Sequence, residues 1–194
     1  MPSAEDIAHL RLIRTPRIGP KNFRKLMDQY GSAVAALDHV PRLASEAGVK
    51  GFEVIPEQRA KDELAKGQSL GAVAHFWQRG FYPQALANAP DAPPFFWAKG
   101  DQALLQKQVI AIVGARNASS LGVRFTRSLA GALGEDGLVI ASGLARGIDM
   151  AAHAASLQTG TIAVQAGGLM NIYPNEAKEL HAKIGETGLV ISEQ

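Results

Sequence analysis

The sequence predicts an α/β protein in which a small all-helical domain precedes a doubly wound, mostly parallel, extended Rossmann-like sheet. Helical hydrophobic periodicity runs to about residue 66, and a proline-rich segment follows it. From residue 109 onward, short apolar runs alternate with amphipathic stretches. Strands and helices that alternate in this way form right-handed crossovers and a parallel sheet. We therefore place the helical domain at residues 1–66 and the Rossmann-like domain at residues 67–194.

The N-terminal domain carries clear helix start and stop signals. Ser3 and Asp6 have the spacing of a capping box. Pro20 suits a first helical position because no N–H is needed there, and Gly31 provides the C-terminal stop of the same helix. Further apolar clusters complete a compact bundle; they lie at residues 34–37, 40–43 and 64.

A proline-rich connection joins the helical and alternating parts of the chain. Residues 72–77 and 95–98 are short, aromatic-rich runs that are predicted as strands. Between them, FYPQALANAPDAPP (81–94) has too many prolines for a long helix. Its bulky apolar residues predict an ordered connection rather than a flexible linker.

Four strands and three helices are predicted to alternate from residue 109. The run VIAIVG (109–114) is continuously apolar, which is typical of a strand buried on both faces. A helix follows at about 121–134, with Leu121, Phe125 and Leu133 on one stripe. The other elements are a strand at 138–142, a helix at 147–159, a strand at 161–167, a helix capped by Asn175, and a strand at 189–193. Because no helix follows the last strand, we expect a fragment of a longer protein.

Composition excludes several classes of protein. The 194 residues include no cysteine, which excludes disulfides, thiolate metal sites and a cysteine nucleophile. The sequence lacks a signal-peptide core and any run near the roughly 20 apolar residues that span a bilayer, so we expect a soluble, cytoplasmic protein. The net charge of +2 does not by itself indicate nucleic-acid binding.

The distribution of charge is more informative than its sum. Six basic residues lie between His9 and Tyr30, against a single acid, Asp28. The six are Arg11, Arg14, Arg17, Lys21, Arg24 and Lys25. A nucleic-acid surface and a merely solvated basic helix face are both compatible with this pattern.

The candidate site lies at the carboxyl ends of the predicted parallel strands, where loops meet helix N-termini. Arg116 and Arg146 project from two glycine-rich loops, and glycine lets backbone approach an anion closely. A guanidinium offers the planar fork that matches a phosphate. Two other interpretations stay open, namely glycines that serve turn geometry alone and an Arg146–Asp149 pair. The three glycine-rich loops are GARNASSLG (114–122), SGLARGID (142–149) and AGGLMNIYPNE (166–176).

Cofactor motifs fit poorly. A dinucleotide site needs G-x-G-x-x-G and an acid about 20 residues further on, but Arg116 stands at the second glycine position. No P-loop ending in Gly-Lys-Ser/Thr is present. Asp149, His153 and Glu176 are acid–base candidates, yet His153 is expected to pack against its helix neighbours or face solvent, and Asp149 suits a first helical turn. We therefore expect no catalytic residue, cofactor or metal.

Several blocks of this sequence resemble a known family. IAIVGARNASSLG, ASGLARGIDMAAHAASL and TIAVQAGGLMNIYPNEAKEL closely resemble the central blocks of the DNA-processing protein A (DprA/Smf) family, with Ala115 in place of the usual serine. FYPQALANAPDAPPFFWAKG resembles the lead-in whose two strands extend the family's sheet. LIRTPRIGPKNFRKLMDQYGS is similar to the family's SAM-like or helix-hairpin-helix domain, with Arg17 where glycine is common. That hairpin either contacts DNA or only packs.

This resemblance implies non-enzymatic work on DNA. It implies a homodimer that binds and protects single-stranded DNA and helps load the RecA recombinase in natural transformation. The family's next conserved stretch would follow Gln194. Matched residue by residue, the resemblance implies DNA contacts at Gly114, Arg116, Ser142, Gly143, Arg146, Gly147 and Lys178.

Two other functions stay open. One is a nucleotide-processing enzyme of the lysine-decarboxylase-like phosphoribohydrolase type, which has a related sheet. Such enzymes carry P-G-G-x-G-T-x-x-E where this chain has AGGLMNIYPNE, without the Gly-Thr step. The other is a scaffold that works mainly through protein–protein contacts.

Overall fold

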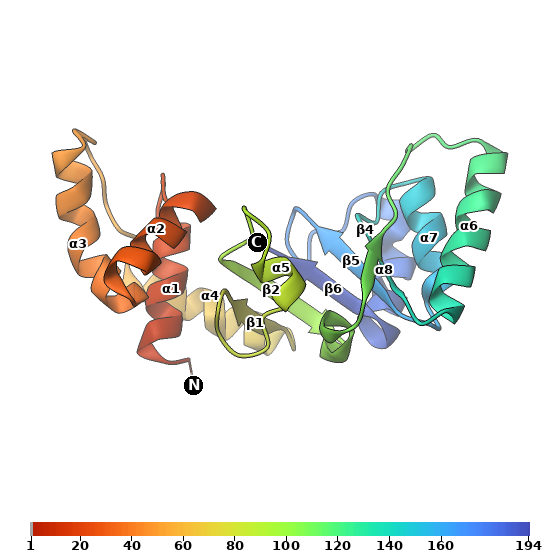
Figure 1. The fold of residues 1–194 in the computed structure, drawn as a ribbon, viewed down its shortest axis with the longest axis horizontal. Coiled ribbons are helices and arrows are strands. Elements are labelled where there is room, and N and C mark those ends of the chain that lie inside the picture. Colours follow the sequence, from red (N-terminus) through yellow and green to blue (C-terminus); the bar gives the residue numbers. More distant parts are fainter. Residues whose placement is uncertain (1) are drawn as a thin grey trace. The chain divides into compact units, whose positions relative to one another are not determined.

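The computed structural model describes residues 2–194, and its contacts divide the chain into two compact units, residues 1–95 and 96–194 (Figure 1). The first unit is mainly helical, and the second is α/β. The division falls at the start of β2 (Phe95–Gly100), later in the sequence than the domain boundary predicted at residue 66. The proline-rich connection therefore packs with the helices that precede it.

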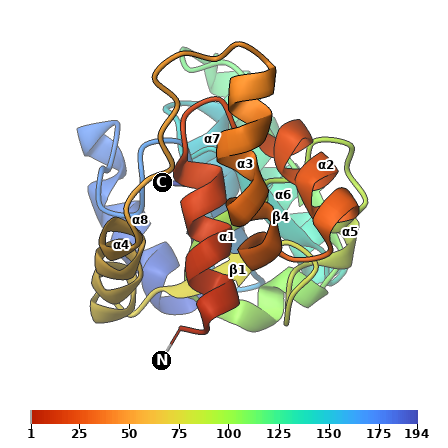
Figure 2. The same cartoon turned by 90° about the vertical axis from the view of Figure 1, so that its left-hand side faces the viewer.

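Four helices build most of the first unit (Figure 2): α1 (Ala4–Arg14), α2 (Pro20–Tyr30), α3 (Ala33–Glu46) and α4 (Glu57–Ser69). The predicted capping box of α1 is confirmed, since Ser3 Oγ accepts from the Asp6 N–H and the Asp6 carboxylate accepts from the Ser3 N–H. The predicted ends of α2 are confirmed as well. It begins at Pro20 and ends at Gly31, whose φ of 74° lies in the left-handed region.

The core of the first unit contains a buried histidine. His9 is fully buried, and its ring lies 4.5 Å from the Phe23 ring and 5.2 Å from the Phe76 ring. Burial and the nearby charge of Arg79 lower the pKa of His9 to about 4. A neutral imidazole is therefore part of this core at neutral pH.

Three of the six basic residues near the N-terminus stabilise the first unit. Arg14 Nη2 lies 2.8 Å from Glu63 Oε1, and Arg11 Nε donates to the Ile55 carbonyl at 3.0 Å. The Arg24 guanidinium donates to the carbonyls of residues 89 and 90 and lies 5.1 Å from the centre of the Trp77 ring. A single basic DNA-binding face is therefore not formed by all six residues.

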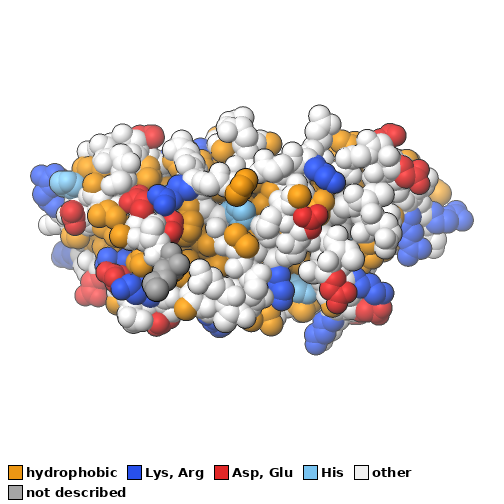
Figure 3. All heavy atoms as spheres, turned by 90° about the horizontal axis from the view of Figure 1, so that it is seen from below, with side chains coloured by type: hydrophobic (Ala, Val, Ile, Leu, Met, Phe, Trp, Pro, Cys, Tyr) orange, Lys and Arg blue, Asp and Glu red, His pale blue; other side chains and the backbone are white. Residues whose placement is uncertain are grey.

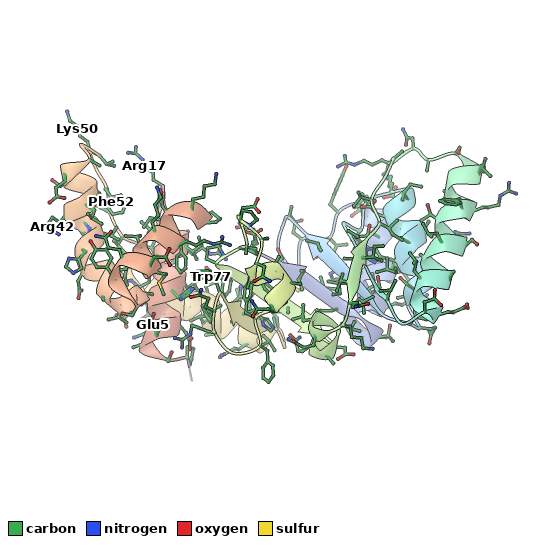
Figure 4. All side chains as sticks on the ribbon, viewed as in Figure 1. Glu5, Arg17, Arg42, Lys50, Phe52 and Trp77 are labelled. Carbon is green, nitrogen blue, oxygen red and sulfur yellow. The ribbon has the colours of Figure 1, made fainter. Side chains whose placement is uncertain are left out.

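The other three basic residues, Arg17, Lys21 and Lys25, are exposed. Arg17 projects away from the helices in Figure 4. Its φ of 73° explains why glycine would suit this position, because the turn between α1 and α2 requires a left-handed backbone. Glu5, also labelled there, accepts from the Val34 N–H and so helps to cap α3.

The proline-rich connection is ordered, as predicted. It follows β1 (Val73–Phe76) and contains a four-residue helix, α5 (Gln84–Ala87), and no long helix. The backbone N–H of Trp77 donates to the Pro94 carbonyl at 2.9 Å, and the Phe76 and Phe95 rings lie 5.1 Å apart. These contacts hold the two ends of the connection together.

The second unit confirms the predicted, mostly parallel sheet. Its strands lie in the order β2-β6-β5-β4-β3, and β2 alone in this group runs antiparallel to its neighbour. Helices α6 and α7 pack on each other and on β4, whereas α8 packs on β5 and β6. The strands of this unit after β2 are β3 (Val109–Ala111), β4 (Val139–Ser142), β5 (Thr161–Gln165) and β6 (Leu189–Ser192), and its helices are α6 (Ser120–Glu135), α7 (Ile148–Ser156) and α8 (Lys178–Thr187).

The prediction that strand 109–114 is buried on both faces is wrong. β3 ends the sheet on one side and covers only residues 109–111, all of them exposed. Val109 and Val113 have 46% and 73% of their surfaces exposed. β3 pairs with a single neighbouring strand, β4 (Val139–Ser142).

The apolar stripe expected on α6 does not face the core. Leu121 and Phe125 are 68% and 66% exposed, whereas Leu133 is partly buried. The helix instead packs through small residues, which are Thr126, Ala130 and Gly134. Small side chains allow α6 to approach α7 closely, so the larger residues are left on the outer face.

The start of the last helix also differs from prediction. Asn175 does not cap it, because residues Asn175–Ala177 form a short 3-10 helix, η2, and Ala177 precedes α8. A second 3-10 helix, η1 (Gln102–Gln106), separates β2 from β3.

Within residues 2–194 no helix is both long and apolar enough to cross a membrane. Basic and acidic side chains are interspersed on the face drawn in Figure 3.

Candidate functional site

The loops after β3 and β4 are joined by one carboxylate. Asp149, in the first turn of α7, is 6% exposed. Its Oδ1 accepts from the Gly114 N–H at 3.3 Å, and its Oδ2 accepts from the Gly143 N–H at 3.1 Å. Asp149 thus pairs with backbone rather than with Arg146, which settles one of the alternatives that the sequence left open. These two amides are already occupied, so they do not act as free anion donors.

Two buried polar side chains support these loops from below. Ser142 is 3% exposed, and its hydroxyl donates to the Ile112 carbonyl at 2.6 Å. His153 is fully buried in α7, so it packs rather than faces solvent. Its Nδ1 lies 2.7 Å from Thr161 Oγ1, whose proton is directed to the Ile140 carbonyl at 2.8 Å. Burial lowers the pKa of His153 to about 4, so its imidazole is neutral at neutral pH.

Glycine is required at position 147 by the close approach of backbone, and at position 114 by the close packing of the Ile148 side chain. Gly147 has a φ of 79°, and a Cβ there would meet the Ala115 carbonyl oxygen and, at 2.6 Å, that of Arg116. A Cβ on Gly114 would lie 2.7 Å from Cγ1 of Ile148. The backbone Ile148 N–H also donates to the Ala115 carbonyl at 3.3 Å. The glycines therefore serve local geometry, and that geometry positions the Arg116 loop against the start of α7.

A cavity of about 440 Å³ opens at the carboxyl ends of the strands, between these loops and the loop after β5. It brings the two predicted arginines, Arg116 and Arg146, to one site. Its other lining residues are Asn117, Gly143, Ala145, Gln165, Ala166, Gly167, Asn171, Tyr173 and Pro174.

The two arginines differ in their surroundings. Arg116 is exposed, and among residues 2–194 it has no ion pair. Arg146 Nη2 lies 2.6 Å from Glu176 Oε1, with 56% and 57% of the two side chains exposed. An exposed pair of this kind is weak and is screened by salt, so Arg146 can exchange the carboxylate for another anion.

Lys178 does not line this cavity. It is exposed at the first position of α8, one turn beyond the loop that contributes Tyr173. Gly114, Ser142 and Gly147 support the loops of the candidate site without lining the cavity. The predicted residues that reach the cavity wall themselves are Arg116, Gly143 and Arg146.

Sequence reasoning missed three polar residues in the wall, namely Asn117, Gln165 and Asn171, and it did not settle whether Tyr173 would be buried or exposed. Tyr173 is 76% exposed. Gln165 is the last residue of β5, and an amide at the carboxyl end of the otherwise apolar run TIAVQ was a signal that could have identified it. Asn117 and Asn171 lie in loops where polar residues are common, so they gave no such signal.

The rest of the described chain offers weaker candidates. A hollow of about 560 Å³ lies in the first unit, but its arginine, Arg79, already lies 3.1 Å from Asp6. Among residues 2–194 no three His, Asp or Glu side chains group in a way that could hold a metal ion. The cavity that contains Arg116 is therefore the candidate site.

Comparison with curated proteins finds similar chains in several bacteria. The chain is 45% identical over 114 residues to DNA processing protein DprA of Streptococcus pneumoniae. The aligned residues make up 58% of this chain and 40% of that protein. It is 39% identical over 110 residues to protein Smf of Escherichia coli, and these residues make up 56% of this chain and 29% of that protein. The chain thus spans less than half the length of these relatives.

Two solved structures are also similar. The X-ray structure of DNA processing protein A from S. pneumoniae matches with a TM-score of 0.65 and 37% identity, over 72% of this chain and 48% of that one. DNA processing protein A from Helicobacter pylori, whose structure was described for its single-stranded DNA binding mode, matches with a TM-score of 0.56 and 30% identity, over 62% and 55% of the two chains.

Family models cover most of the chain. Residues 3–65 match a DprA-like N-terminal helix-hairpin-helix domain. Residues 74–194, which include every residue of the candidate site, match DNA recombination-mediator protein A. The chain therefore belongs to the DNA recombination-mediator protein A (DprA/Smf) family.

Proposed function

We propose that this chain binds single-stranded DNA without catalysis, with the phosphate backbone lying across Arg116 and Arg146. The observation that carries the proposal is the exposed Arg116 guanidinium, which has no carboxylate partner among residues 2–194 and stands at the mouth of a cavity. Phosphate contacts from arginine supply most of the sequence-independent affinity for nucleic acid. An unpaired, exposed guanidinium has no structural task that competes with such a contact.

The predicted contacts take different roles in this proposal. Arg116 and Arg146 bind phosphates directly, and Lys178 adds an outer basic contact further along the strand. Gly114, Gly143 and Gly147 let the loops lie close together, so that the two arginines reach one ligand. Ser142 holds the ends of β3 and β4 together from below.

The similarity to DNA processing protein A from H. pylori supports this assignment, because that structure was described for its single-stranded DNA binding mode. The sheet that carries the cavity lies in the segment that matches the family model. The chain spans only part of the length of its relatives. DNA binding by the whole protein is therefore part of the proposal as well.

Further parts of the proposal concern partners. We propose that the chain acts in the cytoplasm as a homodimer, protects incoming single-stranded DNA and helps load RecA in natural transformation. The name of the family, a recombination mediator, supports a role together with a recombinase.

The exposed apolar side chains of Leu121 and Phe125 on α6 offer a surface on which a second copy of the chain could pack. Sedimentation velocity tests this point, since Phe125→Asp should convert a dimer to a monomer.

A fluorescence anisotropy titration tests the proposed function. Single-stranded and double-stranded oligonucleotides of equal length are titrated at several salt concentrations. We expect the single strand to bind more tightly and its affinity to fall steeply as salt rises. Equal or absent binding of both probes would refute the proposal.

A second experiment tests the absence of catalysis. Incubation of the protein with nucleoside monophosphates should release no free base, and base release above the blank would favour the phosphoribohydrolase alternative instead.

A further inference from the structure

We propose that a cavity in the first unit, apart from the candidate DNA site, binds a small organic oxyanion, either a carboxylate or a phosphate ester. This cavity, the Trp77 cavity, has a volume of about 410 Å³ and is lined by residues between Trp77 and Asn88 of the proline-rich connection. Its volume lies within the range of roughly 300–1,000 Å³ that is usual for small-molecule sites. The proposal does not depend on DNA binding, and neither the sequence motifs nor the family match assigns a role to these residues.

The wall of the Trp77 cavity includes a buried hydrogen-bond donor without an acceptor. Trp77, labelled in Figure 4, is 7% exposed. Its indole Nε1 has no hydrogen-bond partner among residues 2–194. Buried indole N–H groups usually have a partner, because an unpaired donor in the interior is unfavourable. A ligand that brings an oxygen acceptor would therefore complete this wall.

The charge around Trp77 favours an anion over a neutral acceptor. The Arg24 guanidinium lies 5.1 Å from the centre of the Trp77 ring, and its Nε is a second buried donor without a partner among residues 2–194. Arg79 lines the cavity, and Asp6, at 3.1 Å, neutralises this one of the two guanidinium groups. Of the residues that the structure describes, no Asp or Glu lines the cavity. Oxyanions suit such donors, because charge-assisted hydrogen bonds are stronger than neutral ones.

The backbone of the wall is strained at Gln78. Its φ of 59° lies in the left-handed region, which glycine adopts readily and glutamine rarely. The side chain is exposed and forms part of the cavity wall. Strained backbone at a residue other than glycine is frequent at ligand sites. Because glycine would suit this turn better on stability alone, we assign the side-chain amide of Gln78 to contact with the ligand.

NMR of the indole N–H groups tests the proposal, because Trp77 and Trp97 are the two tryptophans of the chain. Isotope-labelled wild-type protein is titrated with sodium phosphate and, separately, with sodium acetate, and sodium chloride keeps the ionic strength constant. The Trp97→Phe variant assigns the two signals. We expect the Trp77 signal to move downfield and to saturate with at least one anion, while the Trp97 signal stays in place. Saturation with phosphate alone identifies a phosphate ester as the ligand, and saturation with acetate alone identifies a carboxylate.

Two variants test the assigned contact. Gln78→Gly removes the amide and suits the φ of 59°, so its urea midpoint should not fall below that of wild type. Its affinity for the anion should fall by about fivefold or more. Arg17→Gly is the matched control, because Arg17 also has a left-handed φ, of 73°, is exposed, and does not line the cavity. It should bind the anion like wild type at an ionic strength that screens surface charge.

Other results would overturn the proposal. If neither anion gives a saturating shift of the Trp77 signal, or chloride alone gives the same shift, the cavity does not bind an oxyanion. If Gln78→Gly binds like wild type, or both variants weaken binding equally, the assigned contact is wrong. A lower urea midpoint for Gln78→Gly would make Gln78 a structural residue. None of these results bears on the proposed DNA site, which is tested separately.

Discussion

The Arg146 guanidinium donates a hydrogen bond to the Glu176 carboxylate at 2.6 Å, and this contact links the loop after β4 to η2. Both side chains are more than half exposed, so the pair adds little to stability. Its consequence concerns binding, because the carboxylate competes with phosphate for one of the two arginines in the proposed DNA site.

Glu176→Gln should therefore strengthen binding of single-stranded DNA. Removal of the competing charge leaves the Arg146 guanidinium available to phosphate, and we expect a gain of about two- to fivefold at low salt, which is the scale of one exposed ion pair. Fluorescence anisotropy at two salt concentrations measures this, and the gain should shrink as salt rises.

Glu179→Gln provides the control. It removes the same charge from the neighbouring helix, where Glu179 Oε1 lies 2.7 Å from Lys183 Nζ, and it leaves the Arg146 contact intact. An equal gain in both variants would show a general charge effect and would contradict the specific competition at Arg146.

Asp149→Asn should weaken DNA binding even though it removes a negative charge near the site. The carboxylate accepts from two backbone amides, and an asparagine side chain has one carbonyl oxygen with which to replace both contacts. We expect a loss of stability of about 1–3 kcal/mol, typical of hydrogen bonds to a charged group. Urea unfolding and DNA titration together check this. Tighter binding with unchanged stability would show that Asp149 acts only through its charge.

Gly147→Ala should disturb the Arg116 loop. The added Cβ would meet the Ala115 and Arg116 carbonyl oxygens, and the φ of 79° is unfavourable for alanine. We expect a loss of stability of at least about 1 kcal/mol and weaker DNA binding. Gly131→Ala is the control, because a Cβ there has open space within α6, and it should leave stability equal or higher by up to about 1 kcal/mol. Equal behaviour of the two variants would contradict the close approach described at Gly147.

Stability should fall between pH 7.5 and pH 5. The pKa values of His9 and His153 are lowered to about 4 in the folded chain, whereas an unfolded histidine has a pKa near 6.5. Below pH 6.5 the unfolded state binds more protons, so the stabilising contribution is complete above that pH and is lost towards pH 4. Each residue should account for about 2 kcal/mol at pH 5.

Urea unfolding at the two pH values measures this loss. The His153→Gln variant should show a smaller difference between pH 7.5 and pH 5 than wild type, since one of the two titrating groups is gone. The same unfolding midpoint for wild type at both pH values would be inconsistent with buried neutral imidazoles.

Much of the fold could be predicted from local sequence patterns. The capping box at Ser3, the ends of α2 and the alternation of strands and helices depend on neighbours in sequence, and the structure confirms them. The exposure of Val109 and Phe125 could not be predicted in this way. It depends on which strand lies at the side of the sheet and on how closely two helices approach, and neither is a local property of the sequence.

The place of the candidate site could be predicted from the sequence, but not all of its contacts could. Glycine-rich loops at strand ends indicated where Arg116 and Arg146 would meet, because parallel strands bring their carboxyl ends together. The partner of Arg146 was predicted less well. Glu176 lies 30 residues away along the chain, whereas the nearer Asp149 turned towards backbone amides.

The most direct test of a phosphate-binding role is the salt dependence of single-stranded DNA binding by wild-type protein and Arg116→Ala. Because Arg116 has no ion pair among residues 2–194, its removal should leave the urea midpoint unchanged. We predict at least about tenfold weaker binding at low salt and a slope of log affinity against log salt that is smaller by about 0.7, the value for one lost phosphate contact. Unchanged affinity and slope in Arg116→Ala would contradict the account.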